Sequence, residues 1–308
     1  MSILQANDEQ DTRTGVIAGL LAYTIWGLFP VYIKIVNSVD PTEVLVHRVI
    51  WAVPFGALIL LFRRQFSEVG RALRNRSTML WLALAALCIS LNWFVYIWAV
   101  QNEHIFQASL GYYINPLVYV LAGVLLFGER LRLLQLIAVV LAAVGVLFLT
   151  LRGEGVPWVA LSLALLFAAY GIIRKQVRIG AMPGLFVETA MLMPLACAWL
   201  VSLLFAGKAT FGGGDLSMDG WLVLAGPFTV LPLLFFATAA RNVSLTALGF
   251  MQYLAPTLQF AFGIYYGEVL TLAHVFCFTC IWIAVLIFSV DAVRAGRKKP
   301  RATVPTGA

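Results

Sequence analysis

Charged side chains are scarce in this sequence. Only 11% of the 308 residues are Asp, Glu, Lys or Arg, whereas 62% are hydrophobic. An average soluble domain has about 25% charged residues. A water-soluble fold could not bury so much apolar surface, but a lipid bilayer can accommodate it. The composition therefore predicts an all-α membrane protein without a soluble domain large enough to act by itself.

The sequence also lacks motifs that several enzyme classes require. It has no GxxxxGK[ST] phosphate-binding motif, which argues against ATP coupling within the chain, and no HExxH zinc motif. Its three histidines, His47, His104 and His274, lie on well-separated segments. The spacing of Cys277 and Cys280 falls inside an apolar run, which favours buried thiols over redox or metal chemistry. No catalytic residue, metal or cofactor is expected.

Long apolar runs recur along the whole chain. A membrane-spanning helix needs about 20 mostly apolar residues to cross about 30 Å of hydrocarbon. Ten runs meet this requirement, and the connections between them are short. The predicted spans are Thr14–Val36, Pro41–Phe62, Thr78–Val100, Ala108–Phe127, Leu133–Thr150, Val156–Ile173, Pro183–Phe205, Trp221–Ala240, Thr246–Tyr266 and Leu270–Val290.

The basic residues of the loops predict the orientation of these spans. Arg48 lies within a span; if the N-terminus is cytoplasmic, Lys34, Arg152 and Lys208 lie outside and the other 17 of the 21 Lys and Arg residues lie inside. An excess of basic residues marks cytoplasmic loops, so both termini are predicted to be cytoplasmic. The basic tail 292–308 is expected to contact anionic lipids at that face rather than nucleic acid.

The two halves of the chain resemble each other at an offset of 140 residues. The matching pairs are Trp81-Leu82 with Trp221-Leu222, Asn102 with Asn242, Tyr113 with Tyr253, Pro54 with Pro194 and Pro116 with Pro256. The predicted repeats, 14–151 and 152–291, follow a short tail, 1–13, and precede the basic tail. Because each repeat holds five spans, the second enters the membrane from the opposite side. Inverted repeats of this kind are typical of secondary transporters.

Two prolines at matching positions predict interruptions of the fourth and ninth spans. Pro116 and Pro256 each lie near the expected membrane midplane, where a proline removes a backbone donor and crowds the preceding turn. Matching helix breaks indicate a substrate site, although a packing kink without ligand contact is the alternative. Aromatic and amide side chains nearby, some of which are expected only to pack between helices, are the substrate-binding candidates. They are Asn92, Trp93, Tyr96, Tyr112, Tyr113, Asn115, Phe250, Gln252 and Tyr253.

Ionisable residues inside predicted spans are candidates for charge coupling. Arg48 and Glu188 stand at the 140-residue offset, and such residues usually face a cavity or a partner. They either form an ion pair or lie on opposite sides of a central site, which the inverted topology favours. Glu188 and His47 are candidate proton carriers, although the sequence favours a hydrogen-bonded interfacial histidine at position 47. Glu129 and Glu268 end the fourth and ninth spans and are predicted to act at helix ends or as gates.

Several segments together resemble one transporter family. They are Tyr23–Gly27 (YTIWG), His47–Trp51 (HRVIW), Trp98–Val100 with Asn102, Ala108–Leu117 (ASLGYYINPL), Gly128–Arg130 (GER), Tyr170-Gly171 with Arg174-Lys175, Leu248–Pro256 (LGFMQYLAP) and Tyr266–Glu268 (YGE). The chain resembles the RarD-type branch of the EamA transporters, within the drug/metabolite transporter superfamily. The resemblance implies ten transmembrane helices in two inverted five-helix repeats around a central solute path. It also implies that Trp26 of the first motif belongs to the substrate-binding candidates.

The expected function is therefore secondary-active or exchange-type transport by alternating access. The chain is predicted to be a bacterial inner-membrane exporter of a small organic solute such as an amino acid, a related metabolite or an amphipathic drug. A membrane-embedded enzyme acting on a lipid or isoprenoid, and a channel or facilitator, are the alternatives. The GxxxG spacing of Gly15 and Gly19 suits internal packing as well as dimerisation, so the oligomeric state is left open.

Overall fold

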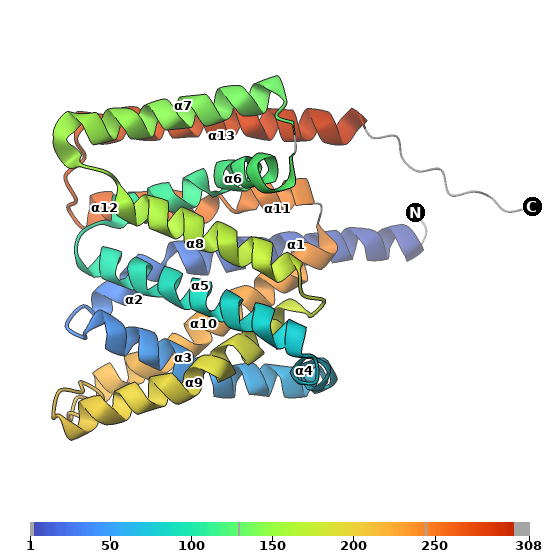
Figure 1. Ribbon diagram of the computed structural model, residues 1–308. Helices are drawn as coiled ribbons and strands as arrows, with labels where there is room; N and C mark the ends of the chain where they lie inside the picture. The colour runs from blue at the N-terminus through green and yellow to red at the C-terminus, as the bar shows by residue number, and fades with distance from the viewer. Residues whose placement is uncertain (1–2, 129, 244, 299–308) are drawn as a thin grey trace, which may run out of the picture. The chain divides into compact units, whose positions relative to one another are not determined.

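The chain is a multi-pass, all-helical membrane protein (Figure 1). The computed structural model describes residues 3–128, 130–243 and 245–298, and all regular structure within these ranges is helical. Eight helical segments in this part of the chain are long and apolar enough to cross a membrane. They are Thr12–Ile35, Pro41–Phe62, Arg76–Gln101, Leu133–Arg152, Trp158–Lys175, Ala181–Phe205, Leu216–Asn242 and Leu272–Asp291.

The helices follow one another with short connections. Those before residue 155 are α1 (Ile3–Gly27), α2 (Phe29–Ile35), α3 (Pro41–Phe62), α4 (Phe66–Leu73), α5 (Arg76–Gln101), α6 (Ile105–Phe127), α7 (Leu133–Leu149) and the π-helix η1 (Thr150–Glu154). Those after it are α8 (Trp158–Lys175), α9 (Ala181–Phe205), α10 (Leu216–Asn242), α11 (Leu245–Met251), α12 (Leu254–Tyr265) and α13 (Leu272–Lys298).

Side-chain caps fix where several of these helices begin. The Asp40 carboxylate accepts a hydrogen bond from the Thr42 N–H at 2.8 Å, and Pro41 occupies the first helical position of α3. Asn75 caps α5 through the Thr78 N–H, and Asp215 caps α10 through the Ser217 N–H. Each cap satisfies an N–H that has no partner within its helix, which stabilises the start by about 1 kcal/mol.

The chain divides into two compact units. Unit 1 comprises the ranges 1–115 and 158–269, and unit 2 comprises 116–157 and 270–308. Within unit 1, α1 packs against α10, α5 against α8, and α3 against both α9 and α10. Within unit 2, α7 lies along α13 (Figure 1), and Gly145 lets α7 approach Cys277 and Cys280 closely.

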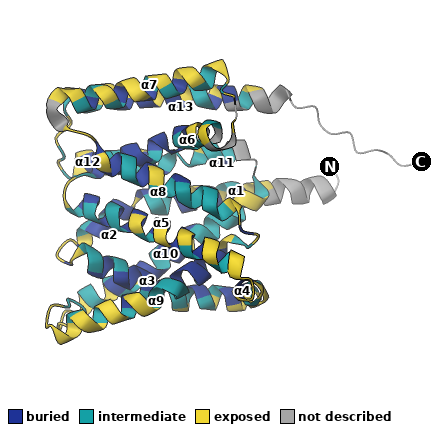
Figure 2. Cartoon of the chain, in the orientation of Figure 1, coloured by how far each residue is buried: buried dark blue, intermediate teal, exposed yellow. Residues whose placement is uncertain are grey.

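Large apolar side chains also cover outward faces of the helices. On α9, Leu195 is 73% exposed and Phe205 is 89% exposed, and most exposed residues of the helix lie in the half that ends at Phe205 (Figure 2). Such a face would be unfavourable in water but matches the hydrocarbon of a bilayer. The scarcity of charge in the sequence thus reflects helices that are apolar on both their packed and their lipid-facing sides.

The GxxxG motif near the N-terminus serves packing within the chain. A Cβ added at Gly15 would lie 2.6 Å from the Asn242 Cβ, and one added at Gly19 would lie 2.5 Å from the Met251 Sδ. Both glycines therefore allow α1 to approach the segments around the end of α10 and α11. Small residues permit this kind of close helix contact in membranes.

The fourth and ninth predicted spans, which contain Pro116 and Pro256, differ from each other. Pro256 lies in the first turn of α12, and the predicted span Thr246–Tyr266 is divided at residues 252–253 between α11 and α12. A proline is tolerated there because first-turn N–H groups have no helical partner. The predicted break at Pro116 is wrong, because α6 continues from Ile105 to Phe127 through that proline. One missing donor does not end a helix whose other backbone bonds persist.

Candidate functional site

Arg48 lies in the interior of unit 1, near the middle of α3. The residue is only 5% exposed, and its Nε donates a hydrogen bond to the Thr229 Oγ1 of α10 at 2.9 Å. Its guanidinium carbon lies 4.6 Å from the centre of the Phe29 ring and 4.2 Å from the centre of the Trp93 ring. Contacts of this kind attract a cation to an aromatic face, so the rings partly offset the cost of burying the charge.

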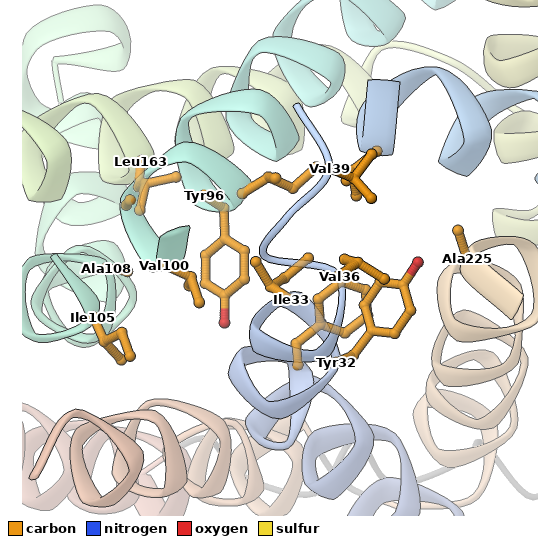
Figure 3. Packing of buried hydrophobic residues seen from close by; sticks show 14 of the residues in the cluster. Tyr32, Ile33, Val36, Val39, Tyr96, Val100, Ile105, Ala108, Leu163 and Ala225 are labelled. Carbon is orange, nitrogen blue, oxygen red and sulfur yellow. The ribbon is translucent and has the colours of Figure 1, made fainter. Parts of the chain in front are cut away.

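Tyrosines extend the aromatic surroundings of Arg48. Tyr96 of α5 is 4% exposed, and its ring centre lies 6.2 Å from that of Phe29 and 5.9 Å from that of Tyr112. Figure 3 shows the Tyr96 ring extending from α5 among the buried residues of α2, including Ile33. Within the described part of the chain, the Tyr96 hydroxyl has no hydrogen-bond partner.

Asn92 joins this group but has its polar atoms satisfied. Its Nδ2 donates to the Leu163 carbonyl at 3.0 Å, and its Oδ1 accepts from the Tyr112 hydroxyl at 3.3 Å. This chain of bonds connects α6, α5 and α8. The structure thus brings together five of the predicted residues, namely Arg48, Asn92, Trp93, Tyr96 and Tyr112.

Arg48 has no ion-pair partner among the described residues, and this decides what the cluster around it can bind. Among the described residues, the ion pairs involve Arg132, Arg174 and His47, and none involves Arg48. The structure gives Arg48 one hydrogen bond, from Nε, while its two terminal nitrogens have no described hydrogen-bond partner. Burying a cation without an opposite charge costs several kcal/mol of folding free energy. Such a site is suited to binding a group that supplies negative charge.

The remaining aromatic candidates lie around the break between α11 and α12. The Tyr113 hydroxyl is 2.6 Å from the Thr257 Oγ1, and the Tyr113 ring stacks on Tyr253 with centres 6.2 Å apart. The Thr257 hydroxyl donates to the Tyr253 carbonyl at 2.6 Å. These contacts tie α6 to the turn that precedes α12. Tyr113 and Tyr253, which stand at the 140-residue offset, are therefore in direct contact with each other.

Four other substrate-binding candidates have different surroundings. Asn115 is buried, and its Oδ1 has no partner among the described residues. Trp26 is half-buried, and its carbonyl accepts a hydrogen bond from Gln259 at 3.1 Å. Gln252 is half-buried in the turn before α12, whereas Phe250 is 48% exposed on α11. A substrate role for these four residues stays a prediction.

Glu188 has a cation partner other than Arg48. Its side chain is fully buried, and its Oε1 lies 3.3 Å from the Arg174 Nη1. The Tyr170 hydroxyl donates to the Glu188 Oε2 at 3.2 Å. Arg174, near the end of α8, also donates to the Gly180 carbonyl. A negative charge and its counter-charge are thus held together between α8 and α9.

His47, the neighbour of Arg48 on α3, has different contacts from Arg48. It is fully buried, and its Nδ1 accepts a hydrogen bond from the Trp51 indole N–H at 3.1 Å. This bond requires the ring proton on Nε2, which lies 4.0 Å from the Glu43 Oε1. The ring also lies against Phe211, with centres 4.7 Å apart. These contacts are those of a hydrogen-bonded histidine packed between helices. A proton-carrying role for His47 stays a prediction.

Glutamates bind backbone N–H groups of distant segments. The Glu268 carboxylate accepts hydrogen bonds from the N–H groups of Ile105 and Phe106, at the start of α6. Burial raises the pKa of Glu268 above its usual range, although these two N–H groups and Lys34 act in the opposite direction. Its geometry is that of a helix cap. Glu129, the matching candidate, lies outside the described residues.

We expect Glu268→Gln to lower the stability of the protein by about 1–2 kcal/mol, because the amide retains one acceptor oxygen for two N–H donors. The melting temperature of the purified protein in detergent measures this loss. Glu103→Gln is the comparison variant, since Glu103 is exposed in the preceding loop and acts on Glu268 only by repulsion between the two negative charges, so its loss should not lower the melting temperature. An unchanged melting temperature for Glu268→Gln would contradict the capping role.

The comparisons with known proteins identify the family. A model of the EamA-like transporter family matches residues 13–151. Over 292 residues the chain is 44% identical to the Uncharacterized transporter PA0485 of Pseudomonas aeruginosa, covering 94% of this chain and 97% of that protein. The chain belongs to the EamA-like transporter family. It is also 42% identical to Protein RarD of Salmonella typhi, over 95% of this chain and 100% of that protein.

A solved structure shares the fold of this chain. A solved crystal structure matches with a TM-score of 0.57 and 19% sequence identity, covering 92% of this chain and 99% of the other. Its low identity restricts the inference to the fold. As a member of the EamA-like transporter family, the chain is a transporter and not an enzyme.

Sequence reasoning missed several residues that build the site of this EamA transporter. Phe29 and Thr229 contact the Arg48 guanidinium, but a phenylalanine and a threonine in apolar helices carry no signal of their own. The sequence predicts Arg174 in a cytoplasmic loop, whereas its side chain is only 15% exposed and contacts Glu188. A buried carboxylate in a span requires a counter-charge, and this requirement was the available signal for Arg174.

Proposed function

We propose that this EamA transporter is a secondary-active or exchange-type carrier that exports a small organic solute by alternating access. The observation that carries the proposal is the correspondence between the two halves. Helices α3, α5 and α6 begin at residues 41, 76 and 105, and α9, α10 and α11 begin 140 residues later, at 181, 216 and 245. This supports two repeats of equal design, the first of which nearly coincides with the family match at 13–151.

The packing of unit 1 has the reciprocity that inverted repeats require. At the 140-residue offset α1 and α2 correspond to α8, and α5 corresponds to α10. The contact of α1 with α10 then corresponds to the contact of α8 with α5, and α3 packs on its own counterpart, α9. In unit 2, α7 likewise packs on its counterpart, α13. Exchange of two tilts between such repeats opens a central site alternately to each side of the membrane.

Two tethers between loops and helix starts support the same proposal. After α3, Glu68 of α4 accepts a hydrogen bond from the Gly180 N–H, at the start of α9. After α9, the N–H groups of Thr210 and Phe211 donate to Glu43, at the start of α3. The corresponding segments are thus joined twice, with donor and acceptor exchanged. Such contacts are available to break and re-form when the two repeats change tilt.

The proposed location is the bacterial inner membrane, with both termini cytoplasmic. The imbalance of basic residues between the two sets of loops supports this orientation. The basic tail would then lie beside anionic lipids. A tag at each end of the chain, tested for protease access in intact spheroplasts, distinguishes the orientation, because cleavage of either tag from outside would contradict it.

Counterflow in proteoliposomes tests the transport mechanism. Vesicles containing the purified protein are loaded with unlabelled solute, and uptake of the same labelled solute is followed for a panel of amino acids, aromatic acids and amphipathic drugs. A carrier accumulates label transiently above equilibrium because an alternating site exchanges solute for solute. Uptake that never exceeds equilibrium for any member of the panel, together with steady conductance, would indicate a channel instead.

A further inference from the structure

The strongest unexplained feature of the described residues is the charge on Arg48. Its guanidinium is buried, it contacts the rings of Phe29 and Trp93, and it has no carboxylate partner among the described residues. Arg174, which is half-buried, has Glu188 as its partner. Arg48 and Glu188, which stand at the repeat offset, therefore differ. The Glu188 carboxylate has a cation partner within the protein, whereas the Arg48 cation has no carboxylate partner among the described residues.

Resting on the transport function proposed above, we propose that Arg48 binds the carboxylate of a solute that carries a single negative charge. The guanidinium uses Nε on Thr229 and keeps its two terminal nitrogens for the ligand. A guanidinium presents its N–H groups in a planar fork that matches a carboxylate. One cation balances one negative charge, whereas a phosphate dianion would leave excess charge in a buried site.

Tyr96 supplies a second group for the same anion. Its ring centre lies 6.2 Å from that of Phe29, the same ring that the Arg48 guanidinium contacts at 4.6 Å. Its hydroxyl is buried without a hydrogen-bond partner among the described residues. An unpaired buried hydroxyl costs about 1–3 kcal/mol. A carboxylate oxygen held by Arg48 would remove that cost by accepting a hydrogen bond from the Tyr96 O–H.

The surrounding side chains indicate the rest of the solute. Phe29, Trp93, Tyr96 and Tyr112 place aromatic surface around the cation, while the Asn92 amide is already bonded to the Tyr112 hydroxyl and the Leu163 carbonyl. Aromatic surface binds apolar groups well but does not replace water around further charges. The inferred substrate class is therefore an amphipathic monocarboxylate, with an apolar aromatic or aliphatic body.

Matched acids and amides test this proposal by binding alone. The probes are phenylacetate with phenylacetamide, indole-3-acetate with indole-3-acetamide, and octanoate with octanamide, each titrated while the melting temperature of the full-length protein is measured. A ligand that binds the native state raises this temperature. We expect at least one acid to bind about tenfold or more tightly than its amide, as a charge-assisted contact requires.

Substitutions at Arg48 and Tyr96 test whether a preference for acids over amides arises at these residues. Arg48→Gln is expected to abolish the preference, Arg48→Lys to weaken it while retaining it, and Tyr96→Phe to reduce acid affinity several-fold. Arg71→Gln, the same change on exposed α4, should leave it intact. No acid-dependent shift in the wild type, or an unchanged preference in Arg48→Gln, would overturn the proposal. Acid binding without counterflow would instead contradict alternating access, and counterflow of neutral solutes alone would contradict only the substrate class.

Discussion

Arg48→Ala should reduce solute counterflow by at least about tenfold while the protein still inserts into the membrane. The substitution removes the unpaired cation and its hydrogen bond to Thr229. A charge-assisted hydrogen bond contributes about 1.5–3 kcal/mol, which corresponds to roughly a tenfold to hundredfold change in affinity. Insertion should persist because alanine is less costly in a membrane span than arginine. Initial counterflow rates per inserted molecule measure the effect.

Three further variants separate the loss of charge from the loss of packing. Arg48→Lys keeps a cation but loses the planar fork, so its transport should fall between those of the wild type and Arg48→Ala. Thr229→Val has nearly the same shape and removes the acceptor of the Nε bond, together with the hydrogen bond from the Thr229 hydroxyl to the Ala225 carbonyl within α10, so a reduction of a few-fold is expected. Arg71→Ala is the exposed control and should transport normally. Wild-type counterflow in Arg48→Ala would exclude Arg48 from the solute path.

Helix positions could be predicted from the sequence because they depend on local information. The predicted second span, Pro41–Phe62, coincides with α3, since Asp40 and Pro41 form a start signal directly before an apolar run. The sequence could not predict that the ninth span divides into two helices while the fourth span stays continuous. Pro116 and Pro256 carry the same local signal, but only the second has a turn directly before it. Packing around each proline decides the outcome, and local sequence does not contain it.

The candidate site was predictable where burial is costly. Arg48, Glu188 and His47 attract notice because ionisable residues are unfavourable inside a membrane span, and all three are buried in the structure. Thr229 and Tyr170 could not be predicted as their partners, because both are ordinary residues of apolar helices. Which pairs form depends on how α3, α8, α9 and α10 pack, which is a property of the folded chain.

Gly226→Ala should lower the stability of the protein by about 1–3 kcal/mol or more, because it overpacks the contact between α3 and α10. A Cβ at Gly226 would lie 2.5 Å from the Trp51 carbonyl oxygen and 2.8 Å from the Trp51 Cβ. Backbone atoms of a packed helix cannot move aside as a flexible side chain can. The helices must therefore separate, and a lower melting temperature in detergent should report it.

The same substitution should also weaken the Arg48 site, because Gly226 and Thr229 lie one turn apart on α10 and face Trp51 and Arg48, one turn apart on α3. Separating the helices at Gly226 draws Thr229 away from the Arg48 Nε, so counterflow should fall along with stability. Gly220→Ala is the matched control on α10, because a Cβ there meets nothing within 4 Å. Alanine is favoured over glycine within a helix by about 0.5–1 kcal/mol, so the control should be neutral or stabilising. Equal melting temperatures for Gly226→Ala and Gly220→Ala would show that α3 and α10 do not depend on this close contact.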